Sequence, residues 1–171
     1  EDGRVDARVD VLVGTTGDDL IVADRGDTRG GRSADDEAHG ALGDDTLYGG
    51  GGDDLLDGGE ERLGDAGPRS ATDTDTAAYR GGRGAYSVTV NGDGSFTVKD
   101  MRQGIAATDG MDTVKGFEQL AFGSQIAGPT LTVGPDRVGM DTFFQALPPV
   151  AASDGTPKPW GLDDAAAFTV N

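Results

Sequence analysis

Apolar residues recur at a fixed interval in the middle of the chain. Leu47 and Leu56 lie nine residues apart, and each is the centre of a short segment, Thr46-Leu47-Tyr48 or Leu55-Leu56-Asp57. Neighbouring side chains of a strand point to opposite faces, so each segment predicts a very short strand whose middle side chain faces inward. Such strands are too short to fold singly. Stacking of successive coils is therefore what buries the leucine row.

Glycine and aspartate follow the same period between these strands. The segment GALGDDTLYGGGGDDLLDGG, residues 40–59, contains two copies of the pattern G-G-x-G-x-D-x-U-x, where U is a large apolar residue, and Ala41 replaces one glycine. Glycines permit tight turns whose carbonyl groups point at a common centre. A flexible glycine-rich linker is the alternative, but it does not explain an apolar residue fixed at the eighth position of both copies.

The turns bring together carboxylate and peptide oxygens, which are hard ligands. A shell of six to eight such oxygens suits Ca²⁺, whereas Mg²⁺ requires a more rigid octahedron and keeps its waters. We therefore predict calcium as the cofactor, with about two to three ions bound. The predicted ligands are carboxylates and main-chain oxygens in the turns, namely Asp19, Asp45, Asp54 and Asp75, with peptide groups near Gly17, Gly43, Gly50 and Gly52.

The repeat extends in both directions with interruptions. Residues 1–13 form a predicted connecting segment that ends in a strand at 9–13, and the unit GTTGDDLIV follows with Thr15 in place of glycine and Ile21 facing inward. Residues 23–42 contain no apolar anchor and are interpreted as a loop inserted into a second turn, with arginines that balance nearby carboxylates or contact an anionic partner. Residues 60–72 form a second insertion, so the predicted roll spans 14–78.

The pattern changes after the roll. Tyr86, Val88 and Val90 alternate with polar residues, as do Phe96 and Val98 after the turn at 91–95, which predicts a β-hairpin within a β-rich cap at 79–127. Residues 109–122 are either one irregular strand or a strand and a helical turn. Asp109 and Asp112 flank Gly110 and either bind a further ion or face solvent. Residues 128–171 form a tail rich in proline whose aromatic residues could dock on the cap.

Composition supports a cation-binding protein with a small core. Of 171 residues only 35% are hydrophobic, 30 are glycine, and the net charge is -17. This charge excludes nucleic acid and anionic membrane surfaces as partners, and membrane insertion is excluded because no apolar run approaches 18 residues. Cysteine is absent, so neither disulfides nor thiolate sites exist. Acidic pairs repel one another in a compact metal-free chain, so we expect folding to depend on calcium.

The motifs in the sequence give little support for an enzymatic activity. His39 is the only histidine, which excludes a zinc site of H-E-x-x-H type, and the chain has no G-x-S-x-G motif for a serine nucleophile. An EF-hand starting at Asp35 fails because Thr46 stands where a bidentate glutamate is required. We therefore expect no catalytic residues and no enzymatic activity.

Residues 14–58 resemble the calcium-binding roll of RTX (repeats-in-toxin) proteins, and residues 75–125 are similar to the segment that often follows it in secreted bacterial members. The resemblance implies an all-β fold, a short parallel β-roll with inserted loops and a C-terminal hairpin cap. It implies that the chain is unfolded in the bacterial cytosol, leaves through a one-step (type I) secretion channel and folds on external calcium. Stacking of this class would pair Asp19 with Asp54 and Asp45 with Asp75.

The leading hypothesis is thus an extracellular calcium-binding module that supports secretion and stability of a larger exported bacterial protein, whose other domains are its partners. The first alternative is an adhesion module on a calcium-stabilised scaffold, which binds a glycan or a cell-surface ligand through the 23–42 loop or the cap. The second is a non-catalytic part of a secreted enzyme.

Overall fold

Short strands make up nearly all the regular structure in the computed structural model, which describes residues 9–23, 34–59, 73–104, 109–127, 130–140, 150–151 and 157–158. The strands are β1 (Val11–Val13), β2 (Leu20–Val22), β3 (Glu37–His39), β4 (Thr46–Tyr48), β5 (Leu55–Asp57), β6 (Thr76–Tyr79), β7 (Tyr86–Val90), β8 (Phe96–Asp100), β9 (Met111–Lys115), β10 (Gln119–Phe122), β11 (Gln125–Ala127), β12 (Thr130–Thr132), β13 (Asp136–Gly139), β14 (Val150–Ala151) and β15 (Pro157–Lys158). One short 3-10 helix, η1 (Arg83–Ala85), lies among the described residues, and no helix there is long and apolar enough to cross a membrane.

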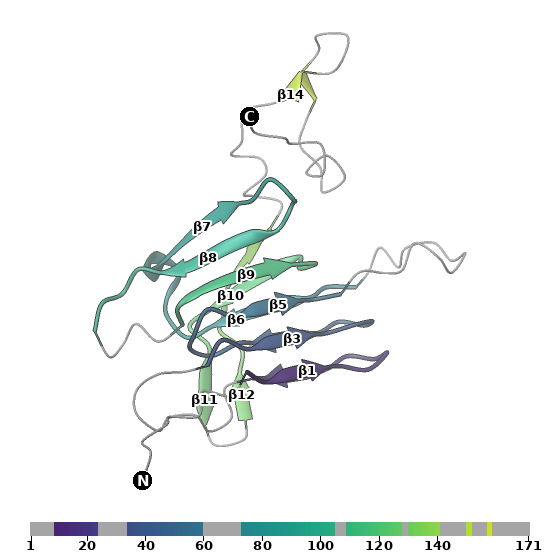
Figure 1. Cartoon of the computed structure of the whole chain (residues 1–171), viewed down its shortest axis with the longest axis vertical. Coiled ribbons are helices and arrows are strands. Elements are labelled where there is room, and N and C mark those ends of the chain that lie inside the picture. Colours follow the sequence, from purple (N-terminus) through teal and green to yellow (C-terminus); the bar gives the residue numbers. More distant parts are fainter. Residues whose placement is uncertain are drawn as a thin grey trace.

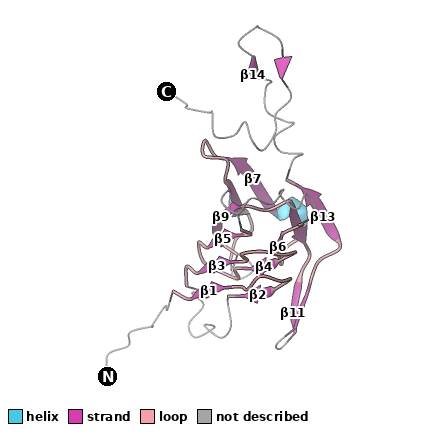
Figure 2. Cartoon of the chain, turned by 90° about the vertical axis from the view of Figure 1, so that its right-hand side faces the viewer, coloured by secondary structure: helices cyan, strands magenta, loops and turns pink. Residues whose placement is uncertain are grey.

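The chain winds alternately between two sheets. One sheet has the order β1-β3-β5-β9-β8-β7 and the other the order β13-β10-β6-β4-β2. The pairs β1–β3, β3–β5 and β5–β9 are parallel in the first sheet, as are β2–β4, β4–β6 and β6–β10 in the second. Figure 1 shows the first sheet as a stack of strands, and Figure 2 shows the second sheet beside it. The architecture is therefore a parallel β-roll, as predicted.

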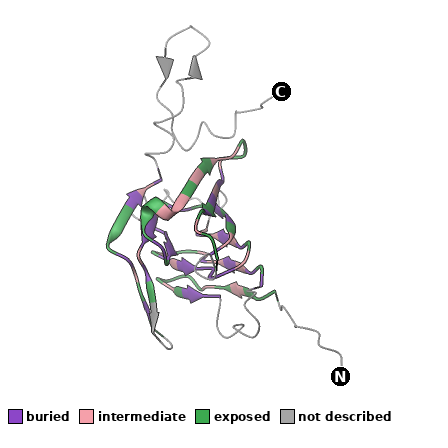
Figure 3. Cartoon of the chain, turned by 90° about the vertical axis from the view of Figure 1, so that its left-hand side faces the viewer, coloured by how far each residue is buried: buried purple, intermediate pink, exposed green. Residues whose placement is uncertain are grey.

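Each roll strand contributes one central residue to the interior. Strand register aligns these residues in two rows that face each other, Leu12, Ala38, Leu56 and Val114 in one sheet and Ile21, Leu47, Ala77 and Leu120 in the other. Leu47 and Leu56, the predicted inward residues, are both 0% exposed. Figure 3 shows the buried residues recurring from coil to coil. Burial of about 1.5–3 kcal/mol per large side chain is thus repeated along the roll.

Strands β9 and β10 continue the roll beyond the predicted boundary at residue 78. Val114 of β9 lies opposite Leu56, and Leu120 of β10 lies opposite Ala77. The segment 109–122, for which the sequence left one strand or a strand and a helical turn open, forms two strands in different sheets. Each strand follows half of the repeat, as Gly110-x-Asp112-x-Val114 and Gly116-x-Glu118-x-Leu120.

The expectation for residues 23–42 was wrong in one respect. Its described part contains strand β3, which pairs with β1 and β5 and places Ala38 in the core with 0% exposure. We had found no apolar anchor there because alanine is a weak hydrophobic signal in a segment rich in charge. Residues 24–33, and all of the predicted insertion 60–72, lie outside the described residues.

The predicted β-hairpin is present and extends the first sheet. Strands β7 and β8 pair in antiparallel register, and β8 pairs with β9 in the same way. Phe96 and Val98 of β8 are buried and join the roll core. The hairpin therefore continues the core past the last coil.

Part of the predicted tail belongs to the fold. Strand β13 pairs with β10 at the edge of the second sheet, and β12 forms a hairpin with β11. Leu131 of β12 packs against Val22, Tyr48 and Ala78 on the outer face of that sheet, where Figure 2 shows β11 and β13 along one flank. The aromatic residues expected to dock on the cap, Phe143, Phe144, Trp160 and Phe168, lie outside the described residues.

Candidate metal centre

Carboxylates line both edges of the roll in two columns. An acidic residue stands two positions before the inward residue of each roll strand, and along each column its amide donates to the acidic side chain of the next coil. Column one consists of Asp10, Asp36, Asp54 and Asp112, joined by amide-to-Oδ1 hydrogen bonds of 2.9, 2.8 and 3.0 Å. Column two consists of Asp19, Asp45, Asp75 and Glu118, and each of its three hydrogen bonds is 2.8 Å long.

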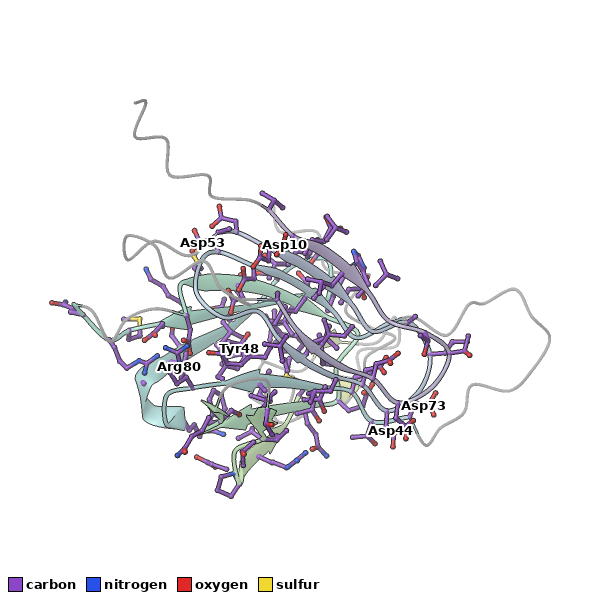
Figure 4. The ribbon with its side chains drawn as sticks, turned by 90° about the horizontal axis from the view of Figure 1, so that it is seen from below. Asp10, Asp44, Tyr48, Asp53, Asp73 and Arg80 are labelled. Carbon is purple, nitrogen blue, oxygen red and sulfur yellow. The ribbon has the colours of Figure 1, made fainter. Side chains whose placement is uncertain are left out.

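A second set of aspartates connects the coils in the opposite direction. Oδ1 of Asp18 accepts the amide of Asp44 at 3.1 Å, and Oδ1 of Asp35 accepts the amide of Asp53 at 2.8 Å. Figure 4 shows Asp10 and Asp53 at one edge of the roll and Asp44 and Asp73 at the opposite edge. The pairs Asp44-Asp45 and Asp53-Asp54 therefore link their turns both to the preceding coil and to the following coil.

Five of the column carboxylates are buried, and one oxygen of Asp45 has no partner among the described residues. Asp45 is 0% exposed, and its Oδ2 accepts no hydrogen bond within the described parts of the chain. This oxygen lies so close to Gly40, the first residue of its own turn, that a Cβ on Gly40 would collide with it. A buried ionised oxygen without a donor is costly, so the site calls for a cation or a proton.

The turns before Asp45 and Asp54 have a shared backbone shape. The second and fourth positions have positive φ, 87° at Ala41 and 110° at Gly43, then 108° at Gly50 and 124° at Gly52. Residues in this left-handed conformation orient their peptide groups differently from residues of an extended strand. The peptide groups near Gly43, Gly50 and Gly52, which the sequence predicts as ligands, thus belong to tight turns that precede the column carboxylates in the chain.

Burial and mutual repulsion disfavour the ionised form of these carboxyl groups. Desolvation, followed by the charges of Glu118 and Asp45, raises the pKa of Asp75 to about 7. Burial also raises the pKa of Asp45, where Asp19 adds repulsion, and the pKa of Glu118. In column one, burial and the charge of Asp54 raise the pKa of Asp112 well above its usual range. A metal-free roll at neutral pH therefore contains carboxyl groups that resist ionisation.

The magnitude of the repulsion is large compared with the stability of a domain. Adjacent strands are about 4.8 Å apart, and two unit charges at that distance repel by on the order of 3 kcal/mol at an effective dielectric constant of about 20. Each column contains three neighbouring pairs. Full ionisation of both columns would thus cost more than the roughly 5–15 kcal/mol that stabilises a typical domain.

The donor set fits calcium when peptide oxygens are included. Among the described residues, no three acidic or histidine side chains converge on one point, so carboxylates alone cannot complete a shell of six to eight ligands. The orphaned oxygen of Asp45, together with the peptide oxygens of the glycine turns, supplies the hard donors that calcium prefers. When bound, the ion would neutralise neighbouring carboxylates and fix adjacent turns.

Asp109 and Asp112, the two aspartates that flank Gly110, have different hydrogen-bond partners. Asp112 ends column one, whereas Asp109 accepts hydrogen bonds from the hydroxyl of Tyr86 and from the amide of Arg80. The guanidinium of Arg102 lies 3.3 Å from Asp109 and 2.5 Å from Asp100. Burial would raise the pKa of Asp100, but the hydrogen bonds and charge of Arg102 outweigh it and lower this pKa.

The stacking expected for the predicted ligands was correct for one pair and wrong for the other. Asp45 and Asp75 are neighbours in column two, as expected. Asp19 is a neighbour of Asp45, not of Asp54, which stands between Asp36 and Asp112 in column one. The error arises because residues 23–42, predicted to be an inserted loop, contain strand β3 and therefore add a coil to the stack.

Three column residues were missed as candidate ligands, namely Asp10, Asp36 and Glu118. Each had a signal in the sequence, because an acidic residue stands two positions before the inward residues Leu12, Ala38 and Leu120. The half-repeat D-x-U or E-x-U, without the glycines, is present at Asp10 and Glu118, whereas Asp36 precedes the small residue Ala38.

The fold and these columns define a parallel β-roll whose edges are lined with acidic turns. Residues 6–27 and 30–61 match the family model described as the RTX calcium-binding nonapeptide repeat, in four copies. This match supports a calcium-binding β-roll of the RTX type. No curated protein matches the chain.

Proposed function

We propose that the chain is a non-enzymatic folding module, which takes up calcium outside the bacterial cell and thereby supports secretion and stability of a larger exported protein. The observation that carries the proposal is the buried Oδ2 of Asp45, which lacks a donor in a column of acidic neighbours. Such a column favours an extended chain where calcium is scarce and a folded roll where calcium is abundant. Only the unfolded form suits passage through a narrow channel.

The environment of His39 supports the non-enzymatic part of the proposal. Its Nε2 lies 2.7 Å from Glu37 and its Nδ1 lies 3.2 Å from Asp57, which also accepts Lys115 at 2.9 Å. Both ring nitrogens are therefore used in a bridge between β3 and β5. A catalytic histidine needs one nitrogen for its substrate or nucleophile.

Circular dichroism of the chain at neutral pH tests the calcium dependence. We expect a disordered spectrum in chelator and a β-sheet spectrum after addition of calcium, with magnesium at the same concentration as control. A full β-sheet spectrum in chelator at neutral pH would contradict the proposal. Attachment of the chain to a reporter exported by a one-step channel tests secretion, which should fail when cytosolic calcium is raised enough to fold the roll.

A further inference from the structure

The turn before Asp19 has a feature that the next turn of column two, before Asp45, lacks. Thr15 stands at the second position of the unit Gly14-Thr15-Thr16-Gly17-Asp18-Asp19. Its amide donates to Oδ2 of Asp19 at 2.6 Å, and its hydroxyl donates to the same oxygen at 2.9 Å. The carboxylate oxygen of the sixth position is thus already held by two donors of its own turn.

In the next turn of column two, the equivalent carboxylate oxygen belongs to Asp45 and is not held by donors of its own turn. Oδ2 of Asp45 has no partner among the described residues, and the second position of that turn is Ala41, which has no hydroxyl. The side chain of Asp45 is fully buried, whereas Asp19 is only partly covered. The two turns are adjacent, with the amide of Asp19 donating to Oδ1 of Asp45 at 2.8 Å.

The backbone of the first turn also differs. Ala41 and Gly43 have φ of 87° and 110°, and the turn before Asp54 repeats this with Gly50 and Gly52. Thr15 and Gly17 are not among the residues with positive φ in the described chain. Left-handed backbone is unfavourable for a β-branched residue, so Thr15 accounts for the change. The peptide groups of this turn therefore follow a different course from those of the two later turns.

We propose that Thr15 closes the first turn to calcium, so that Asp19 ends column two with a hydrogen-bonded carboxylate where later turns take an ion. Thr15 is a positioning residue, and its two donors replace the cation. This inference rests on the proposed calcium-binding function. It removes Asp19 and the peptide group near Gly17 from the ligands predicted from the sequence.

The arrangement suits the end of a roll. Among the described strands, β2 lies at the edge of its sheet, so the first turn of column two has a coil on one side only. Among the described residues, Asp19 therefore has a neighbouring turn of column two on one side only. A threonine that satisfies the carboxylate locally stabilises this turn in the folded roll without an ion.

The single substitution Thr15→Gly restores the consensus sequence, since residues 14–19 then read Gly-Gly-Thr-Gly-Asp-Asp. It removes the hydroxyl donor and the barrier to positive φ. The experiment counts calcium ions per full chain by equilibrium dialysis and elemental analysis, for wild type and for Thr15→Gly. We expect Thr15→Gly to bind one ion more than wild type.

Three matched variants complete the test. Thr15→Ser keeps the hydroxyl and Ala41→Gly changes the same position of the next turn, so both should bind as many ions as wild type. Asp19→Asn should also leave the number unchanged. An unchanged number in Thr15→Gly, or the loss of an ion in Asp19→Asn, would overturn the assignment of Thr15. Absence of calcium from wild type would instead overturn the proposed function, so the two failures are distinct.

Discussion

The hydroxyl of Tyr86 donates a hydrogen bond to the buried carboxylate of Asp109, and this contact joins the hairpin to the loop that precedes β9. The same hydroxyl accepts the amide of Gly81 at 2.8 Å, and the guanidinium of Arg102 lies 5.5 Å from the centre of the Tyr86 ring. Tyr86 also packs against Tyr79 and Phe122 of the second sheet. The hairpin is thereby attached to the roll by an ion-pair network that needs no metal.

This network yields a prediction that separates Asp109 from the column carboxylates. Asp109→Asn leaves the charge of Arg102 with Asp100 alone, and we expect a loss of about 3 kcal/mol in the free energy of unfolding. The number of bound calcium ions should stay the same, because Asp109 belongs to neither column. Denaturant unfolding in saturating calcium, with the ion count of the same sample, checks both parts. Loss of an ion would place Asp109 in a metal site.

Asp45→Asn should have opposite effects with and without calcium. In calcium the variant lacks a ligand, and stability should fall by about 2.7 kcal/mol at a calcium concentration one hundredfold above the dissociation constant. In chelator the variant removes a buried acid whose pKa is raised by desolvation and by Asp19, so β-structure should appear on acidification at the same pH as in wild type or at a higher pH. Thermal melting in calcium and circular dichroism against pH in chelator measure the two effects. A lower pH midpoint in chelator would argue against electrostatic repulsion.

The metal-free chain should become more stable as the pH falls. The pKa of Asp75 is about 7 in the folded roll and about 3.9 in an unfolded chain, so the folded state binds more protons between these values. Stability from this group is therefore present below pH 4 and is lost as the pH rises through 7. We expect β-structure in chelator to increase between pH 8 and pH 5, measured by circular dichroism.

Calcium should reverse this pH dependence. Ligand carboxylates must be ionised to bind the ion, so binding releases protons and weakens on acidification. Calorimetric titrations at pH 8 and pH 6, in two buffers of different ionisation enthalpy, would report both the affinity and the proton release. A calcium affinity that does not change with pH would contradict a role in calcium binding for the carboxyl groups whose pKa is raised.

Gly40 offers a steric test of the same site. A Cβ at this position would collide with Oδ2 of Asp45 and with the peptide oxygen of Gly58. Gly40→Ala should therefore weaken calcium binding by at least tenfold and destabilise the holo form by about 1–3 kcal/mol. Gly84→Ala is the matched control, because Gly84 is exposed in η1 and a Cβ there meets no atom within 4 Å. Equal effects of the two substitutions would contradict the steric argument.

The sequence predicted those parts of the roll in which glycine, aspartate and a large apolar residue recur together. The strands around Leu47 and Leu56 were found because all three signals agree there. The strand with Ala38 was missed because a small inward residue suffices when its neighbours in the row, Leu12 and Leu56, fill the interior. Because the coil that contains β3 was not counted, Asp19 was paired with Asp54 of column one and not with Asp45 of column two.

The last coil was missed for a different physical reason. Strands β9 and β10 contain only the later part of the nine-residue repeat, and Val114 and Leu120 keep them in register. Because the first three residues of the repeat are missing, Gly110 and Gly116 are six residues apart. A search for nine-residue spacing does not detect them. The covering hairpin that contains Leu131 depends on contacts with the outer face of β4, which no local pattern of residues reports.

The hairpin β7–β8 lies in the chain between two successive coils of the roll, yet β9 resumes the stacking on β5 in perfect parallel register. The structural unit is thus half a coil, and the connection between two units can carry a sequence of its own. The connection between residues 79 and 110 accordingly adds a hairpin to the first sheet and to the core, while the strands before and after it keep the register of the roll.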